Sequence, residues 1–302
     1  MSPEQIVGIA ADIRARTDRP FALNLWVSDH DPGGFDRDPA QLAALRELFA
    51  PYFAELGLEV PELPERAFHP FEQQVEALLE ARPHVFSFVF GVPRPAILEA
   101  CRQRGIVTLG AATSIAEARA LDEAGVELVV ASGSEAGGHR PSFLAAAEDS
   151  LMGTFALTPL VADRVQAPVV AAGGIVDRRG VAAALQLGAQ AAQIGTAFLA
   201  CEESGASDEH RALLFSDRAE HTMLTRSFTG RLARGLRNRW TDERHGHPTA
   251  AFPLHAWFTS ALKRAAAAAH RTDLVSLWSG QAAPNLRHKT AAELFAALVQ
   301  EN

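Results

Sequence analysis

The sequence has few cysteines, few aromatic residues, no excess of positive charge and no long apolar run. Its two cysteines, Cys101 and Cys201, share no motif and lie in apolar surroundings, so we expect buried free thiols and a reducing compartment rather than a disulfide framework. The formal net charge of -8 at pH 7 excludes the basic footprint of a nucleic-acid-binding protein. No apolar stretch is long enough to span a bilayer, and no signal peptide is recognisable. We therefore expect a cytoplasmic protein that binds neither nucleic acid nor membrane.

Small and aliphatic residues are abundant, and they suit helices packed closely on a parallel sheet. Short runs of β-branched and other apolar residues alternate with longer amphipathic segments. Each run has the length and the continuous apolarity of a strand that is buried on both faces. The six strands that this pattern predicts are 21–25, 85–90, 106–110, 127–131, 168–172 and 191–195, and a weaker seventh lies near 222–228.

Helical segments with recognisable ends fall between these strands. Ser114 and Glu117 have the spacing of a capping box at the start of one helix. Asp177 opens another helix, which ends at Gly188. The order helix, glycine, strand is typical of right-handed βαβ units. The sequence therefore predicts an α/β protein with a TIM-type (β/α)8 barrel.

An eight-stranded barrel needs one strand more than the pattern supplies. The chain begins directly in a helical pattern, with Ser2 at the N-cap and Pro3 at the first helical position. We therefore expect the barrel to lack its first β-strand. The proline-rich segment of about 29–70 is expected to be a long insertion. Residues 1–228 would form the barrel, and residues 229–302 a C-terminal helical extension packed on it.

Glycine-rich segments follow three predicted strands at their carboxyl ends, where barrel enzymes build active sites. Gly173 and Gly174 precede a helix opened by Asp177, and Gly195 and Thr196 enter the next helix. Glycines let backbone N–H groups approach an anion closely, and helix N-termini favour negative charge. A single such turn is more simply explained as a tight connection, but two on consecutive strands favour a phosphate site. No Gly-x-Gly-x-x-Gly segment indicates a Rossmann fold.

His139 is the sharpest candidate for chemistry. It follows Gly137 and Gly138 at the carboxyl end of a strand, rather than lying on an apolar helix face. Its neighbour Arg140 could bind an anion or could simply be solvated, and both readings stay open. Glu135 could take part in catalysis, but we favour a role in bracing the loop backbone.

Two other segments are weaker candidates. His245 and His247 have a metal-like spacing, yet no third ligand lies nearby in the sequence, so we expect no metal. Trp278 begins a Trp-Ser-Gly-Gln segment that ends at Gln281 and is expected to be an ordered loop between helices. On its own, an aromatic residue there is more simply explained by packing than by ligand binding.

Several segments closely resemble the nitronate monooxygenase (2-nitropropane dioxygenase) family. They occur in the family's order over nearly the whole chain, which makes the resemblance specific for the family, although related FMN barrels use other substrates. The resemblance implies FMN without a metal, in a barrel with a helical extension. The segments that carry it are 87–91, 133–140, 172–175, 193–198, 234–238 and 277–281.

The resemblance also implies roles for particular residues. It places Asn24 and Gly137 near the isoalloxazine ring, and it matches His139 to the active-site histidine that faces the substrate nitro group. Ser132 stands where the family usually has glutamine, so a flavin ring atom could bond to water there instead. The remaining residues implied to bind the cofactor are Gly138, Gly173, Gly174, Gln193, Ile194, Gly195, Thr196, Trp278, Gly280 and Gln281.

The chemistry so implied is FMN-dependent oxidation of an alkyl nitronate, such as propionate 3-nitronate, or of a small nitroalkane. Oxygen is the co-substrate, and the products are a carbonyl compound and nitrite. His139 could donate a hydrogen bond to the nitronate oxygens or accept a proton from a neutral nitroalkane, and both roles stay open. We expect a monomer or a homodimer.

Two alternatives remain. The protein could be an FMN-dependent NAD(P)H:quinone or enoyl-thioester reductase, although no separate dinucleotide motif is present. It could also be a truncated, inactive homologue of the flavin barrels. The family begins with a strand and a Pro-Met-containing loop at the flavin, which this sequence lacks. We expect that the true start of the chain lies upstream of Met1.

Overall fold

The computed structural model describes residues 1–28, 38–63 and 68–299. Its centre is a parallel sheet in which six strands follow one another in the order β1-β2-β3-β4-β6-β7. The six predicted strands and the α/β class with a parallel sheet are therefore confirmed. The strands are β1 (Ala22–Trp26), β2 (Val85–Val89), β3 (Val107–Ala112), β4 (Leu128–Ser132), β6 (Val169–Ala172) and β7 (Ala191–Gln193).

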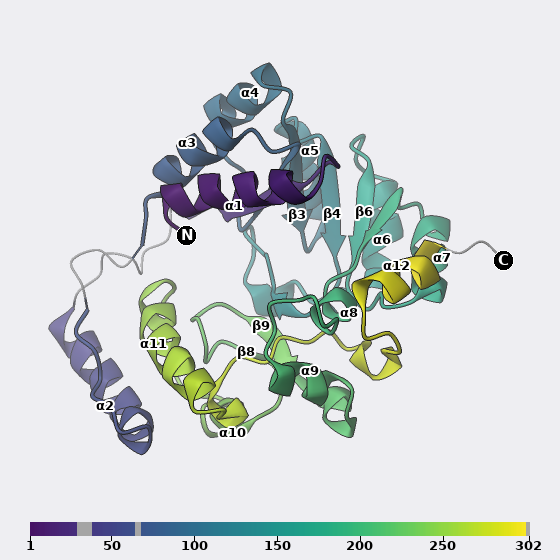
Figure 1. The fold of residues 1–302 in the computed structure, drawn as a ribbon. Helices are drawn as coiled ribbons and strands as arrows, with labels where there is room; N and C mark the ends of the chain where they lie inside the picture. Colours follow the sequence, from purple (N-terminus) through teal and green to yellow (C-terminus); the bar gives the residue numbers. More distant parts are fainter. Residues whose placement is uncertain (29–37, 64–67, 300–302) are drawn as a thin grey trace.

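Helices that alternate with these strands cover one face of the sheet, as Figure 1 shows. The predicted helix starts are confirmed: the side chains of Ser2, Ser114 and Asp177 each accept a backbone N–H of the first turn. Glu117 does not close the predicted capping box, because its carboxylate accepts the N–H groups of Thr113 and Phe143 instead. The helices are α1 (Pro3–Arg16), α3 (Phe71–Ala81), α4 (Pro95–Gln103), α5 (Ile115–Glu123), α6 (Thr154–Ala162) and α7 (Arg178–Gln186).

Alternation of side chains along the strands separates a core face from a cavity face. Leu25, Phe88 and Val129 point into the main core under the helices. Their neighbours on the opposite face include Val130, which forms a smaller apolar cluster with alanines of β3 and β6. The register places Ser132 beside Ala172, and Ala172 beside Gln193. The carboxyl ends of three strands therefore meet in one row.

A second, antiparallel sheet lies across these strand ends. It consists of β5 (Gly138–His139), β9 (Ala233–Leu236) and β8 (Thr222–Thr225), in that order. The prediction of a seventh barrel strand near 222–228 is wrong, because β8 pairs antiparallel with β9 rather than with β7. Gly230 (φ +78°) lies in the short connection, which allows a hairpin but no parallel crossover. The expected boundary after residue 228 falls within this connection.

A second hydrophobic core joins the predicted insertion to the C-terminal region. Helix α2 (Pro39–Glu55) packs against α11 (Leu254–Ala268), and Figure 1 shows the two side by side. Phe49 stacks on Trp240 of α10 (Arg239–Glu243) and on Phe258 of α11, with ring centroids 5.5 and 5.6 Å apart. Of the predicted insertion, residues 29–37 and 64–67 lie outside the described part of the chain.

The remaining helices are short or terminal. They are α8 (Thr196–Leu199), α9 (Asp208–Leu214) and α12 (Ala291–Val299). Cys101 and Cys201 are both free and buried, as expected. Within the three described ranges, no helix has the length and apolar character needed to cross a membrane.

Candidate active site

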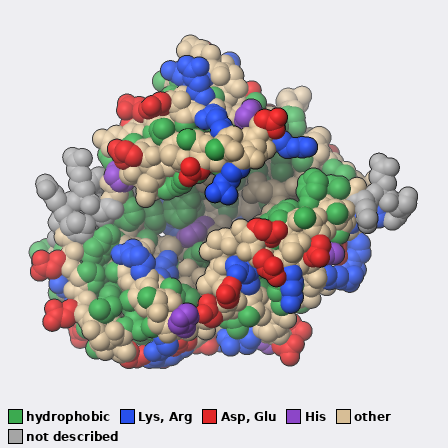
Figure 2. All heavy atoms as spheres, in the orientation of Figure 1, with side chains coloured by type: hydrophobic (Ala, Val, Ile, Leu, Met, Phe, Trp, Pro, Cys, Tyr) green, Lys and Arg blue, Asp and Glu red, His purple; other side chains and the backbone are tan. Residues whose placement is uncertain are grey.

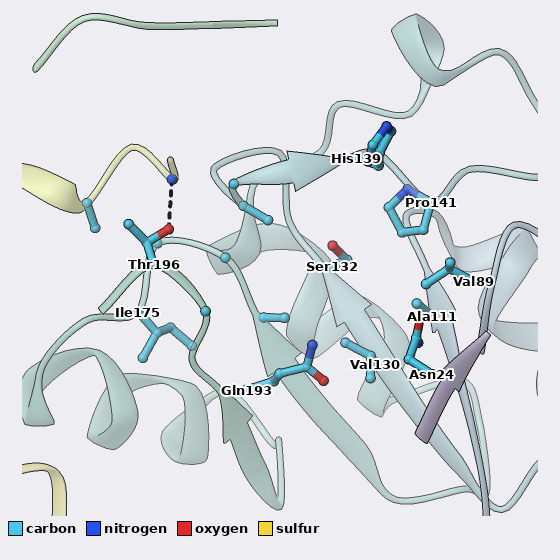
Figure 3. A pocket seen from close by; sticks show the side chains of 18 of the residues that line it. Asn24, Val89, Ala111, Val130, Ser132, His139, Pro141, Ile175, Gln193 and Thr196 are labelled. Atoms are coloured by element: carbon cyan, nitrogen blue, oxygen red, sulfur yellow. Dashed lines mark hydrogen bonds between the residues drawn. The ribbon is translucent and has the colours of Figure 1, made fainter. Parts of the chain in front are cut away.

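A cavity of about 360 Å³ opens at the carboxyl ends of the parallel strands. Val89, Ala111 and Val130 give its wall an apolar surface. Asn24 of β1 and Gln193 of β7 enter it from the two edge strands, and Figure 3 shows both side chains directed into the cavity. The face drawn in Figure 2 is hollowed between the α1 region and the α9–α11 region, with hydrophobic side chains along the hollow.

Two glycine turns form one end of the cavity. Gly173 and Gly174 adopt positive φ angles of +107° and +71°, which residues with a side chain rarely adopt. A Cβ atom built on Gly195 would meet nothing within 4 Å, so the backbone there borders open space. The next residue, Thr196, accepts a hydrogen bond from the Gly280 N–H at 2.9 Å through its hydroxyl. Exposed backbone of this kind, at the start of a helix, suits an anionic group.

Gly137 lies where the late segment of the chain reaches the cavity. A Cβ atom on Gly137 would come within 2.6 Å of the Gly280 nitrogen and 2.7 Å of the Ser279 carbonyl carbon. The N–H of Gln281 donates to the carbonyl of Glu135 at 2.9 Å, which fixes the same contact. The close approach of the two backbones therefore requires a glycine at this position.

Glu135 and Arg140 hold the loop after β4 from within. The Glu135 carboxylate accepts hydrogen bonds from the backbone N–H and from the hydroxyl of Thr154, both at 2.9 Å. Glu135 therefore braces the loop backbone, as the sequence analysis favoured. Arg140 is 1% exposed and donates to the carbonyls of Ser132 at 2.9 Å and Ser150 at 3.0 Å. Both readings of Arg140, an anion site and a solvated side chain, are therefore wrong. The Arg140 side chain instead joins two backbone segments, because its guanidinium donates to the carbonyl oxygens of Ser132, Gly133 and Ser150.

His139 lies on β5 at the opposite end of the cavity from the glycine turns (Figure 3). Its ring is half-buried in a cage of aromatic rings, with centroid distances of 4.8 Å to Trp26, 5.3 Å to Trp278 and 6.2 Å to Phe90. Its Nε2 atom lies 2.8 Å from the hydroxyl oxygen of Thr229, which orients the ring.

The cage determines the charge of His139. Burial lowers the pKa of His139 to about 3, and the positive charges of Arg231 and Lys263 act in the same direction. The imidazole is therefore neutral at neutral pH and has one donor nitrogen and one acceptor nitrogen. Burial also lowers the pKa of Lys263, whose ammonium lies 6.0 Å from the Phe228 ring centroid.

The structure brings most of the predicted site residues to one cavity, and leaves four beside it. Gly138 precedes His139 in a left-handed conformation, and Ile194 packs into the apolar core behind the glycine turns. Trp278 contacts the ring of His139, while the side chain of Gln281 is exposed. The predicted residues that line the cavity are Asn24, Ser132, Gly137, His139, Gly173, Gly174, Gln193, Gly195, Thr196 and Gly280.

Sequence reasoning missed several residues at the His139 end. Trp26 lies two positions after Asn24 on the same strand, so the period of two was a signal that could have found it. Phe90 adopts φ +70°, an uncommon conformation for an aromatic residue, and no local sequence pattern predicts it. Thr229 and Arg231 reach the site from the connection between β8 and β9, where their sequence context looks like any loop.

No metal site is formed by the described residues: they contain no group of three or more His, Cys, Asp or Glu side chains placed to hold an ion. The weak candidates His245 and His247 are both exposed.

Comparisons with known proteins agree with one another over almost the whole chain. A family model described as Nitronate monooxygenase matches residues 2–301. The chain is 42% identical over 296 residues to a nitronate monooxygenase of Pseudomonas aeruginosa, covering 96% of this chain and 83% of that protein. It is 39% identical over 300 residues to one of Paraburkholderia phytofirmans, covering 97% and 81%. A solved structure of nitroalkane oxidase from Streptomyces ansochromogenes matches with a TM-score of 0.90 and 34% identity, covering 98% and 84%.

Proposed function

The chain belongs to the nitronate monooxygenase family, and we propose that it binds FMN in the cavity at the strand ends and oxidises small alkyl nitronates there. Oxidation of nitronates is the activity of this family, whose members are typically flavin-dependent. Within that activity, we assign oxygen as the oxidant, and a carbonyl compound and nitrite as the products. The observation that carries the assignment is a neutral, caged His139 at the end of the cavity opposite its glycine turns.

The architecture supports this placement. We propose that the six consecutive parallel strands belong to a TIM-type barrel, because each follows its neighbour in sequence order and the cavity lies at their carboxyl ends. Residues 229–302 would then be the extension that closes one side of the site. Gly280 from this region already lines the cavity.

The residues present fit FMN. The backbone at Gly195 borders open space, and Gly174 lines the same cavity; a phosphate would be held there by N–H groups, beside the hydroxyl of Thr196. Asn24 and Gln193 offer amide donors and acceptors on an otherwise apolar wall, which suits the polar edge of an isoalloxazine ring. The cavity volume of about 360 Å³ lies within the usual range of cofactor sites. Ser132, at the end of β4, lines the same cavity with a short hydroxyl side chain.

When bound, FMN supplies the electron transfer that the side chains of the protein cannot perform. The side chains supply charge and placement. Arg231 and Lys263 both act electrostatically on His139, and positive charges at this distance also favour an anion at the substrate end of the cavity. Trp26, Phe90 and Trp278 keep water from the same end, which strengthens that attraction.

The low pKa of His139 favours one of its two possible roles. A base with a pKa of about 3 is a poor acceptor for the proton of a neutral nitroalkane. A neutral imidazole can still donate one hydrogen bond to a nitronate oxygen, from Nδ1, when the Thr229 hydroxyl donates to Nε2. We therefore assign His139 to orientation of the preformed nitronate anion, and the nitronate rather than the nitroalkane is the substrate.

The test is oxygen uptake by the protein reconstituted with FMN, using a preformed nitronate and no reduced nicotinamide. Absorption of the bound oxidised flavin is recorded first, so that failure to bind the cofactor is separated from failure to react. We expect nitronate-dependent oxygen uptake with release of nitrite. Uptake that requires NADH would instead support a quinone or enoyl-thioester reductase, and a protein that retains no flavin would support an inactive homologue.

A further inference from the structure

A separate hollow of about 500 Å³ is lined by residues of α9, of α11 and of the segment that follows α11. Among the described residues, none lines both this hollow and the cavity that contains His139. Its volume lies within the usual range of small-molecule sites. The proposed oxidation of nitronates makes no use of it, so its wall has to be explained separately.

The charged side chains in this wall are mostly basic. Three basic side chains and one carboxylate line the hollow: Lys263, Arg264, Arg271 and Glu209. Arg271 is paired with Asp273 at 2.7 Å. The Glu209 carboxylate lies 2.6 Å from Nδ1 of His270. Two of the four charges are therefore occupied by neighbours, and positive charge remains.

Lys263 is a half-buried cation without a counter-charge. Burial lowers the pKa of Lys263, and the neighbouring charge of Arg264 acts in the same direction. Within residues 1–28, 38–63 and 68–299, Lys263 makes no hydrogen bond or ion pair. Removing a charge from water without a partner is costly, so buried cations are usually paired. The position of Lys263 therefore favours an anionic ligand in the hollow.

One stretch of backbone separates the hollow from the reacting end of the cavity. Leu277 lines the hollow, and the ring of the next residue, Trp278, lies 5.3 Å from that of His139. Nε2 of His210, another residue of the wall, lies 3.1 Å from the carbonyl oxygen of Trp278. The charge of Lys263 also acts on His139. A ligand in the hollow is thus linked to the caged histidine through both packing and charge.

We propose that this hollow binds a small organic acid, with its carboxylate at Lys263 and its apolar body against Val275 and Leu277, and that the bound acid weakens the binding of nitronate. One unpaired ammonium matches one carboxylate, and the apolar side chains of the wall match a hydrocarbon body. The carboxylate would offset the positive charge that Lys263 directs at the substrate end, so acid and nitronate bind antagonistically. The binding claim stands alone, whereas the antagonism rests on the proposed function.

Binding is tested by equilibrium dialysis of the FMN-loaded protein with benzoate and with benzamide, which has the same shape but no charge. We expect benzamide to bind about 10-fold more weakly or worse, because it forms no charge-assisted contact. Ala267→Phe places a ring in the hollow and should weaken binding of benzoate by about 10-fold or more. Ala268→Phe, at the next position of α11, does not line the hollow and is the matched control. Both alanines are exposed, so neither substitution should unfold the protein.

The antagonism is measured as kcat/KM for a preformed nitronate at rising concentrations of benzoate. We expect kcat/KM to fall by about 5-fold and then to level off, because ligands at two separate sites can be bound together. Ala267→Phe should match the unaltered enzyme without benzoate and should not respond to it. Ala268→Phe should respond as the unaltered enzyme does.

Three results would overturn the site: no binding of benzoate, equal binding of benzamide, or equal affinity for benzoate in the two alanine variants. A fall of kcat/KM towards zero that persists in Ala267→Phe would place benzoate in the cavity instead. Benzoate that binds in the hollow without changing kcat/KM would overturn the antagonism. If the FMN-loaded enzyme oxidises no nitronate, the proposed function is contradicted, while the dialysis still decides the site.

Discussion

The Nε2 atom of His139 lies 2.8 Å from the hydroxyl oxygen of Thr229, a residue ninety positions later in the chain. This contact joins β5 to the connection between β8 and β9. It holds the imidazole in the aromatic cage in one orientation, and it leaves the other ring nitrogen outside this contact. The precision of the proposed site therefore depends on a residue that has no chemistry of its own in the reaction.

Removing the Thr229 hydroxyl should impair turnover more than binding of the cofactor. In Thr229→Val the ring of His139 loses its anchor, and we expect kcat on a preformed nitronate to fall by about 10-fold, because small misplacements of a reacting group are costly. Flavin content should stay unchanged. Thr229→Ser keeps the hydroxyl and is the control. A serine variant as impaired as the valine variant would show that the methyl group, and not the hydrogen bond, matters.

The neutral state of His139 predicts a simple pH profile. Its pKa of about 3 lies far below neutrality, so kcat/KM on a preformed nitronate should stay flat between about pH 5 and pH 8, where an ordinary histidine titrates. The profile is measured with freshly prepared nitronate, at FMN saturation. A limb with an apparent pKa near 6.5 that disappears in His139→Gln would contradict the account.

Two glycine substitutions should separate packing from phosphate binding. Gly137→Ala places a Cβ atom 2.6 Å from the Gly280 nitrogen, so it should reduce stability by about 1–3 kcal/mol and disturb the cavity. Gly195→Ala meets no atom within 4 Å, so the melting temperature without cofactor should not fall. Its added methyl group occupies the proposed phosphate space, and FMN should bind more weakly. Unchanged FMN affinity in Gly195→Ala would place the phosphate elsewhere.

Acid should destabilise the fold through buried histidines. The pKa of His255 is lowered to about 4 by burial, and this side chain is 1% exposed. Between about pH 6.5 and pH 4 the unfolded chain binds a proton at this position that the folded chain does not, so the free energy of unfolding falls as the pH falls, by up to about 1.4 kcal/mol per pH unit. Urea titrations at several pH values measure this slope. A His255→Gln variant with an unchanged slope would show that other groups cause it.

Strands of the parallel sheet were predictable because each is a continuous apolar run that only a strand buried on both faces explains. The same reasoning failed for β8, since the turn at Gly230 and its pairing with β9 are invisible to periodicity. The region of the site was predictable because glycines and His139 follow strand ends. The structural role of Arg140 was not predictable, because its position next to His139 in the sequence does not show which backbone carbonyls surround its side chain.

The cage around His139 shows the same limit. Trp26, Phe90 and Trp278 come from three segments that are far apart in the sequence, and only the tertiary fold brings their rings to one histidine. The depressed pKa of His139 follows from that assembly. A sequence motif could identify the histidine, but its charge state is a property of the folded protein.

The most direct test of nitronate oxidation at this cavity is anaerobic mixing of the FMN-loaded protein with substrate, followed by absorption of the bound flavin. We predict that a preformed nitronate bleaches the oxidised flavin, that NADH at the same concentration does not, and that His139→Ala slows the bleaching. Rapid bleaching by NADH together with no response to the nitronate would contradict the account.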